Sequence, residues 1–151
     1  MHRYALSVLA IVFLVAAEDS KDEAIKKELA KMKGTWKAVS LEIDGNKPIP
    51  DDMLEKLQCV IDADGKGTVQ FDGATILAAT NKIDPTKKPK TLDATFTEGD
   101  MKGETSLAIY ELKDDTLKYC RATPGKDRPT EFSSKPGSGQ TLVVYKRAKA
   151  Q

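Results

Sequence analysis

The chain has 151 residues, with 24 Lys and Arg against 23 Asp and Glu and a hydrophobic content of 40%. This near-neutral balance, with both signs interspersed, gives the protein no electrostatic reason to bind nucleic acid or an anionic membrane. The hydrophobic content excludes a disordered chain, and the length fits one compact domain, which we expect to be a monomer.

The first residues have the layout of a secretory signal peptide. A basic start, Met1-His2-Arg3, leads into an apolar run over residues 5–17, which is too short for an ordinary membrane-spanning helix. Val15-Ala16-Ala17 supplies the small residues of a cleavage site, and the acidic pair Glu18-Asp19 follows at once. We expect residues 1–17 to be removed and the remainder to be exported, either periplasmic or secreted, without stable membrane insertion. An uncleaved N-terminal anchor is the alternative.

Loss of the signal peptide would change the chemistry available to the mature chain. His2 is the only histidine, so its removal excludes Ser-His and Cys-His nucleophiles and the common zinc sites. We therefore predict no catalytic residues, no metal and no cofactor, with a carboxylate-based enzyme as the catalytic alternative. Cys59 and Cys120 would enter an oxidising compartment, where they could pair.

Two helical segments are expected, both in the first part of the chain. In residues 20–33, Ser20 and Glu23 form a capping box, and apolar residues recur at helical spacing. A second, short helix over residues 50–57 has an aspartate as its expected cap. The N-terminal helical segment therefore covers residues 18–33 and precedes the main domain, residues 34–151.

The rest of the chain alternates between strand-forming segments and turns rich in Gly, Pro and Asp. The candidate strands are residues 35–43, 59–62, 68–71, 75–83, 92–97, 105–112, 116–122, 130–133 and 141–147. Short strands at near-regular spacing, joined by short loops without helices, favour a barrel over a sandwich. We predict a mainly all-β fold, an up-and-down antiparallel barrel of about eight strands with a short N-terminal helix.

One hairpin can be aligned residue by residue, with Leu112 and Leu117 on either side of its loop. The alignment opposes Tyr110 with Tyr119 and Ala108 with Arg121 on one face, and Glu111 with Lys118 and Ile109 with Cys120 on the other. The face that holds the tyrosines is the more apolar one and is expected to point inward. Arg121 then also points inward, toward a pocket or its mouth.

The same alternation of side chains predicts on which face of the sheet each of the two cysteines lies. Over residues 59–71 it places Cys59, Ile61, Val69 and Phe71 on the inner face of the barrel. Cys120 lies on the outer face of its hairpin, so a disulfide with Cys59 is disfavoured unless a β-bulge reverses one side.

A short acidic segment imitates the start of a calcium-binding loop. Asp62 and Asp64 stand at the first and third positions, with Gly67 at the sixth. The fifth position is Lys66, however, and the twelfth is Gly73 where calcium requires a bidentate glutamate. The segment is therefore interpreted as a hairpin turn, and no metal site is predicted.

Gly34-Thr35-Trp36, just after the predicted helix, resembles the Gly-x-Trp start of the lipocalin and calycin superfamily. In those proteins the tryptophan closes one end of the barrel and a basic residue from the last strand packs across its ring. The resemblance implies that Trp36 and Arg147 form this closing contact by cation–π stacking. The alternative is an ordinary buried tryptophan, and both readings are structural.

A longer pattern resembles an uncharacterised conserved domain that recurs in planctomycete proteomes. The segments that carry the resemblance, within residues 29–147, are Gly34-Thr35-Trp36-Lys37, Val39-Ser40-Leu41, residues 83–90, Ile109-Tyr110-Glu111-Leu112, Leu117-Lys118-Tyr119-Cys120, residues 124–132 and residues 135–139. The resemblance implies a lipocalin-like fold with no established activity, so it carries over no catalytic residue. A cysteine at the position of Cys120 is usual in that family, whereas Cys59 is less typical.

The function expected from these observations is non-catalytic binding of a small, partly apolar ligand inside the barrel. Tyr110, Tyr119 and Arg121 are the expected ligand-binding residues in the cavity. Arg128, in the polar connection over residues 124–136, is expected near the entrance, where it could hold an anion; alternatively it pins its loop to a backbone carbonyl. A cavity of roughly 300 Å³ or more would favour ligand binding. A filled barrel that acts as an extracytoplasmic interaction domain is the second hypothesis.

Overall fold

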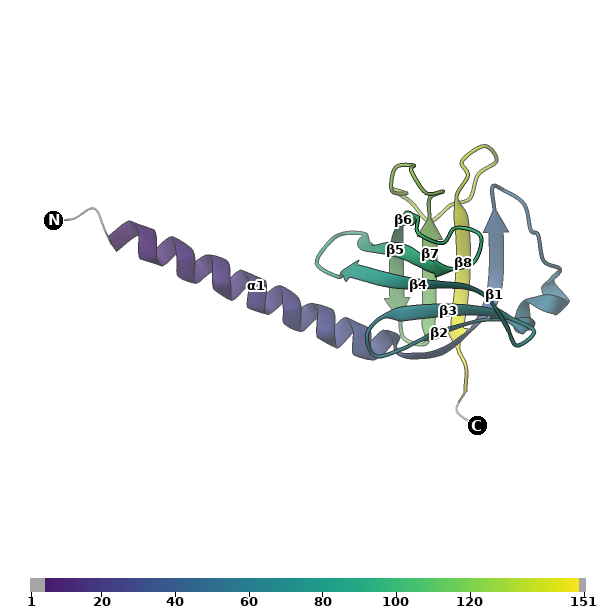
Figure 1. The fold of residues 1–151 in the computed structure, drawn as a ribbon, viewed down its shortest axis with the longest axis horizontal. Coiled ribbons are helices and arrows are strands. Elements are labelled where there is room, and N and C mark those ends of the chain that lie inside the picture. The colour runs from purple at the N-terminus through teal and green to yellow at the C-terminus, as the bar shows by residue number, and fades with distance from the viewer. Residues whose placement is uncertain (1–4, 150–151) are drawn as a thin grey trace.

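The structure is a computed structural model that describes residues 5–149, with side chains from residue 16 onward. It begins with one long helix, α1 (Ala5–Met32), which Figure 1 shows leading away from a compact barrel. A short 3₁₀ helix, η1 (Asp51–Lys56), lies between the first two strands. The strands are β1 (Gly34–Ile43), β2 (Leu57–Ile61), β3 (Lys66–Phe71), β4 (Ala74–Asp84), β5 (Lys90–Glu98), β6 (Thr105–Lys113), β7 (Thr116–Arg121) and β8 (Thr141–Arg147).

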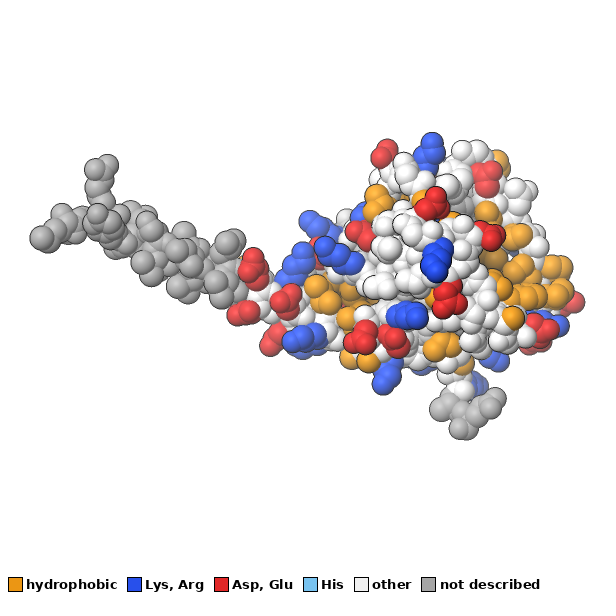
Figure 2. All heavy atoms as spheres, in the orientation of Figure 1, with side chains coloured by type: hydrophobic (Ala, Val, Ile, Leu, Met, Phe, Trp, Pro, Cys, Tyr) orange, Lys and Arg blue, Asp and Glu red, His pale blue; other side chains and the backbone are white. Residues whose placement is uncertain are grey.

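The strands form a closed, antiparallel, up-and-down barrel. Each strand pairs with its neighbours in sequence, and β8 pairs with β1 to close the sheet. The predicted fold class is therefore confirmed, as is the register of the β6–β7 hairpin, in which Tyr110 opposes Tyr119 and Ala108 opposes Arg121. Acidic and basic side chains are interspersed over the barrel face seen in Figure 2.

One predicted strand is absent. Residues 130–133 belong to the connection between β7 and β8 and pair with no strand. Local contacts replace the ladder there: the Ser133 amide donates to the Glu131 carbonyl, and the Lys118 ammonium lies 5.4 Å from the centre of the Phe132 ring. The connection packs its side chains against the outer face of β6 and β7. It adds no strand there, because the sheet is already closed.

The N-terminal helix is longer than predicted. Residues 5–33 contain no Gly or Pro, so nothing in the backbone ends a helix between the apolar run and the amphipathic segment. The expected capping box at Ser20 and Glu23 therefore lies inside α1. Met1-His2-Arg3, the expected basic start of the signal peptide, lies outside the described residues, as do Ala150 and Gln151 at the end of the predicted domain.

The short second helix is present, but the predicted aspartate cap is wrong. The N-cap residue of η1 is Pro50, which makes no side-chain cap hydrogen bond. Among residues 5–149, no helix combines the length and the hydropathy needed to cross a membrane.

Trp36 and Arg147 close the barrel at the α1 end. The Arg147 guanidinium lies 4.2 Å from the centre of the Trp36 ring, which is fully buried. The Trp36 Nε1–H donates to the Met32 carbonyl at 2.8 Å, and Arg147 donates to the carbonyls of Lys31 and Lys33. The predicted contact is therefore present, and it also joins the last turn of α1 to the sheet.

A hydrophobic cluster stabilises the domain. It fills much of the barrel interior, where Cys59, Ile61 and Val69 face inward as predicted. On the outer face of the sheet, Ile109 and Cys120 oppose each other and are also buried. The Cys120 Sγ contacts the Ser133 carbonyl at 3.3 Å, and both cysteines are free thiols on opposite sides of the sheet. The structure therefore agrees with the expectation that they do not pair.

Candidate functional site

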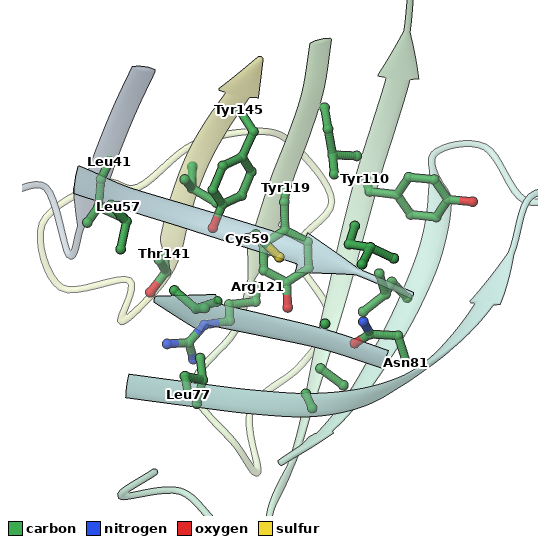
Figure 3. Close-up of a pocket in the computed structure, with 18 of the residues that line it drawn as sticks. Leu41, Leu57, Cys59, Leu77, Asn81, Tyr110, Tyr119, Arg121, Thr141 and Tyr145 are labelled. Carbon is green, nitrogen blue, oxygen red and sulfur yellow. The ribbon is translucent and has the colours of Figure 1, made fainter. Parts of the chain in front are cut away.

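The barrel encloses a cavity of about 190 Å³, with a wall that is mostly apolar. The side chains around it in Figure 3 come from β1 to β8 and include Leu41, Leu57, Leu77 and Tyr145. At the α1 end, Met32 forms the floor. At the other end, Ile43 and Ile76 are 40% and 52% exposed, so the cavity opens to solvent between them.

The size of the cavity limits what it can hold. At about 190 Å³ it falls short of the roughly 300 Å³ that was expected to favour ligand binding and that is typical of sites for drug-sized ligands. It is somewhat larger than an apolar cavity of ~150 Å³ that binds benzene. The space therefore suits a molecule with a body of roughly six to ten heavy atoms.

Arg121 reaches the cavity from the last position of β7. Its guanidinium lies 5.6 Å from the centre of the Phe96 ring, and its Nη1 is 3.8 Å from the Met101 Sδ. A thioether sulfur is a weak acceptor, so most of the five N–H donors of Arg121 have no strong partner among the described residues.

Two tyrosines add hydroxyl groups to the same wall. Figure 3 shows Tyr119 of β7 and Tyr145 of β8 with their rings in the cavity, on the side that holds Arg121. Burial raises the pKa of both phenols, and the nearby Arg121 guanidinium opposes part of the rise at Tyr119. Both tyrosines are therefore neutral at physiological pH, and neither hydroxyl forms a hydrogen bond within residues 16–149.

Cys59 is the potential nucleophile in the wall. Burial raises the pKa of its thiol to about 12, so the thiol stays protonated and unreactive at neutral pH.

Comparisons with protein-family models, curated proteins and solved structures returned no match. The chemistry of the wall is therefore the basis for a functional interpretation.

Tyr110 lies at the cavity as predicted, but its hydroxyl serves another purpose. It donates to the Glu28 Oε1 at 3.2 Å, and Figure 3 shows the phenol oxygen pointing away from Tyr119 and Arg121. The Lys90 ammonium contacts the same Glu28 oxygen at 2.6 Å. Glu28 is buried, so its charge requires these partners. Only the ring of Tyr110 is available to a ligand.

Arg128 does not lie in the cavity wall, so its predicted place at the entrance is wrong. Its Nη1 donates to the carbonyls of Leu92 and Ala108 at 3.2 and 2.7 Å, and its Nη2 pairs with the Asp93 carboxylate at 2.6 Å. Asp93 alternates with the inward-facing Leu92 and Ala94, so these contacts lie on the outer face of β5 and β6. The alternative prediction, in which Arg128 pins its loop to backbone carbonyls, is confirmed.

Sequence reasoning missed Tyr145 and Glu28. Applying the alternation of strand residues to β8 would have placed Tyr145 on the same face as Thr141 and Val143, which also line the cavity. Glu28 lies on the apolar stripe of α1, next to Leu29 and between Ile25 and Met32. A carboxylate in such a stripe signals a buried ion pair, although its partner Lys90 is far away in sequence.

Proposed function

We propose that this protein is an exported, monomeric, non-catalytic binding module whose barrel accepts a small, partly apolar ligand. The single observation that supports the proposal most strongly is the cavity of about 190 Å³ that opens at one end. Small barrels either fill their interior with side chains or hold one ligand. The open space favours the second role over a filled barrel that acts only through its loops.

The arrangement of the two barrel ends also supports a binding role. One end is closed by Trp36, Arg147 and the last turns of α1. The exposed apolar side chains Ile43 and Ile76 stand at the other end, where a ligand with an apolar body would enter. Such a one-ended apolar pocket is the common form of a small-molecule site.

Ligand binding can be tested with toluene, a neutral probe of suitable size. In an NMR titration of the full-length or mature protein, we expect saturable chemical-shift changes at cavity residues such as Val143 and Leu117. Ala94→Phe places a ring in the cavity, since Ala94 is a buried wall residue, and should abolish the changes. Ala74→Phe adds the same ring at an exposed position and is the matched control.

Two results would overturn the proposal. One is the absence of saturable binding to the wild-type protein. The other is binding that Ala94→Phe leaves intact. If Ala94→Phe does not fold, Ala79→Leu fills the same cavity with a smaller increase in volume.

A further inference from the structure

Arg121 is the only ionised side chain among the described residues that line the cavity. The remaining wall residues are apolar or neutral, and no Asp or Glu is among them. An ion beside an apolar space is unfavourable unless a counter-charge or water solvates it. The wall therefore offers a positive charge whose counter-ion is missing from the described part of the protein.

The other two described arginines show how this protein normally treats a guanidinium. Arg128 pairs with Asp93 at 2.6 Å, and Arg147 pairs with Asp115 at 3.2 Å. Both also donate to backbone carbonyls. Arg121 has neither kind of partner within residues 16–149, and its contacts are a phenyl ring and a thioether. Most N–H donors of its guanidinium therefore remain free to bind a ligand in the cavity.

The phenols of Tyr119 and Tyr145 supply further donors beside this charge. Because both stay protonated when buried, each can donate a hydrogen bond to an acceptor that enters the cavity. A planar carboxylate matches the N–H fork of one guanidinium and has a single negative charge, whereas a phosphate dianion would leave charge uncompensated. The apolar space that extends to Met32 suits a hydrocarbon tail.

We propose that the ligand is a small monocarboxylate with an apolar tail, held by its carboxylate at Arg121 and the two tyrosine hydroxyls. This inference rests on the proposed function, since it names the ligand class of the same cavity. With its carboxylate included, such a ligand has roughly six to ten heavy atoms, by comparison with the benzene-sized cavity above. The alternative role of Arg121 is purely structural, as a cap that stacks on Phe96.

Octanoate, octan-1-ol and octylamine separate these roles because they share one tail and differ in the head group. In calorimetric titrations of the wild-type protein at pH 7.5, we expect octanoate to bind at least tenfold more tightly than octan-1-ol, and octylamine to bind most weakly. Arg121→Gln should reduce octanoate affinity at least tenfold and leave octan-1-ol affinity within twofold. Tyr119→Phe and Tyr145→Phe should each weaken octanoate binding severalfold.

Lys102→Gln is the matched control. Lys102 is an exposed cation in the β5–β6 loop, close in sequence to Met101, and it lies outside the cavity wall. Its loss should leave the affinities for all three compounds unchanged, which separates a contact in the cavity from long-range charge attraction.

Equal binding of octanoate and octan-1-ol by the wild-type protein would overturn the inference while leaving the binding function in place. If neither compound binds and toluene also fails to bind, the proposed function itself is overturned. An equal loss of both ligands in Arg121→Gln would assign Arg121 a structural role and also overturn the inference. The wild-type preference decides the matter even if the variant does not fold.

Discussion

At the scale of single residues, the partners of each arginine determine its role. Arg147 stacks on Trp36 and holds the end of α1, and Arg128 holds the β7–β8 connection on the outer face of the barrel. Arg121, which has no carboxylate partner among the described side chains, faces the cavity. The same residue type thus serves barrel closure, loop anchoring and, in our proposal, ligand binding.

The anchoring role of Arg128 leads to a stability prediction. Arg128→Gln removes the guanidinium contacts to Leu92, Ala108 and Asp93, so the free energy of unfolding should fall by about 1.5–3 kcal/mol, the range for hydrogen bonds to charged groups. Urea unfolding measures this loss. Lys126→Gln, an exposed cation of the same connection, should change the free energy of unfolding by less than about 0.5 kcal/mol.

Ligand affinity provides the second readout for Arg128. Toluene and octanoate binding should be the same in folded Arg128→Gln as in the wild-type protein, because Arg128 lies outside the cavity wall. A selective loss of octanoate binding in this variant would contradict the assignment and restore a role for Arg128 at the entrance.

The residue-level predictions succeeded where a regular ladder constrained the chain. The alternation of side chains in a hairpin is enough to place Tyr119 and Arg121 on one face, and the structure has that register. Arg128 lies in an irregular connection, where no periodicity relates sequence to direction, so its two alternatives could not be separated. The Glu28–Lys90 pair depends on how α1 docks, which sequence periodicity does not specify.

At the scale of elements, two ion pairs within residues 16–149 join α1 to the barrel. Lys21 contacts the Asp84 carboxylate at 3.0 Å, and Glu28 contacts Lys90 at 2.6 Å. Leu29 packs close to Gly65 in the β2–β3 turn. The helix from Lys21 onward therefore belongs to the folded domain.

Because Asp84 contacts α1, protonation of its carboxylate should make the free energy of unfolding depend on pH. Hydrogen bonds from Thr86 and then from Lys21 lower the pKa of its carboxyl group from 3.8 to about 2. A carboxylate with a lowered folded-state pKa contributes stability above its unfolded-state pKa, and this contribution is lost as the pH falls to the folded-state value. Asp84→Asn should therefore be less stable than the wild-type protein at pH 5, and the gap should close between about pH 4 and pH 2.

Urea unfolding of the wild-type protein and of Asp84→Asn between pH 5 and pH 2 measures the difference in their free energies of unfolding. Thr86→Val is the companion variant, because it removes the hydroxyl that donates to Asp84. When Asp84→Asn is made in the Thr86→Val background, it should lower the free energy of unfolding at pH 5 by less than it does in the wild-type protein. A stability difference that persists unchanged at pH 2 would exclude this titration as the cause.

The element-level prediction failed where one local signal had two meanings. The apolar residues 5–17 indicate a signal peptide and also contain no helix-breaking Gly or Pro, so the helix begins earlier than its predicted capping box. Residues 130–133 have a strand-like composition but lie over the outside of a barrel that is already closed. Closure of the sheet by β1 and β8, a contact between distant segments, leaves no edge for a ninth strand.

At the scale of the whole molecule, the proposed export is compatible with the way α1 docks. The ion pairs that join α1 to the barrel begin at Lys21, after the expected cleavage at Ala17. Cleavage would therefore leave the docked half of the helix in place and return Ser20 to its first turns, where a capping residue is favourable.

Intact-mass measurement of the protein from its own host tests the proposed cleavage and export. We expect a mature chain that begins at Glu18 and is recovered from the periplasm or the medium, because the cleavage motif precedes that residue. Ala17→Arg should block processing, whereas Ala24→Arg, inside the docked segment, should not affect it. A mass that retains residues 1–17 in the wild-type protein would contradict the proposed cleavage.

We propose above all that the barrel cavity is a ligand site with Arg121 at its mouth. A crystal structure of the protein grown with octanoate tests it most directly. We predict electron density for one molecule inside the barrel, with its carboxylate on the Arg121 guanidinium and its tail directed toward Met32. A barrel interior filled by its own side chains, with octanoate absent or bound only on the outside, would contradict the claim.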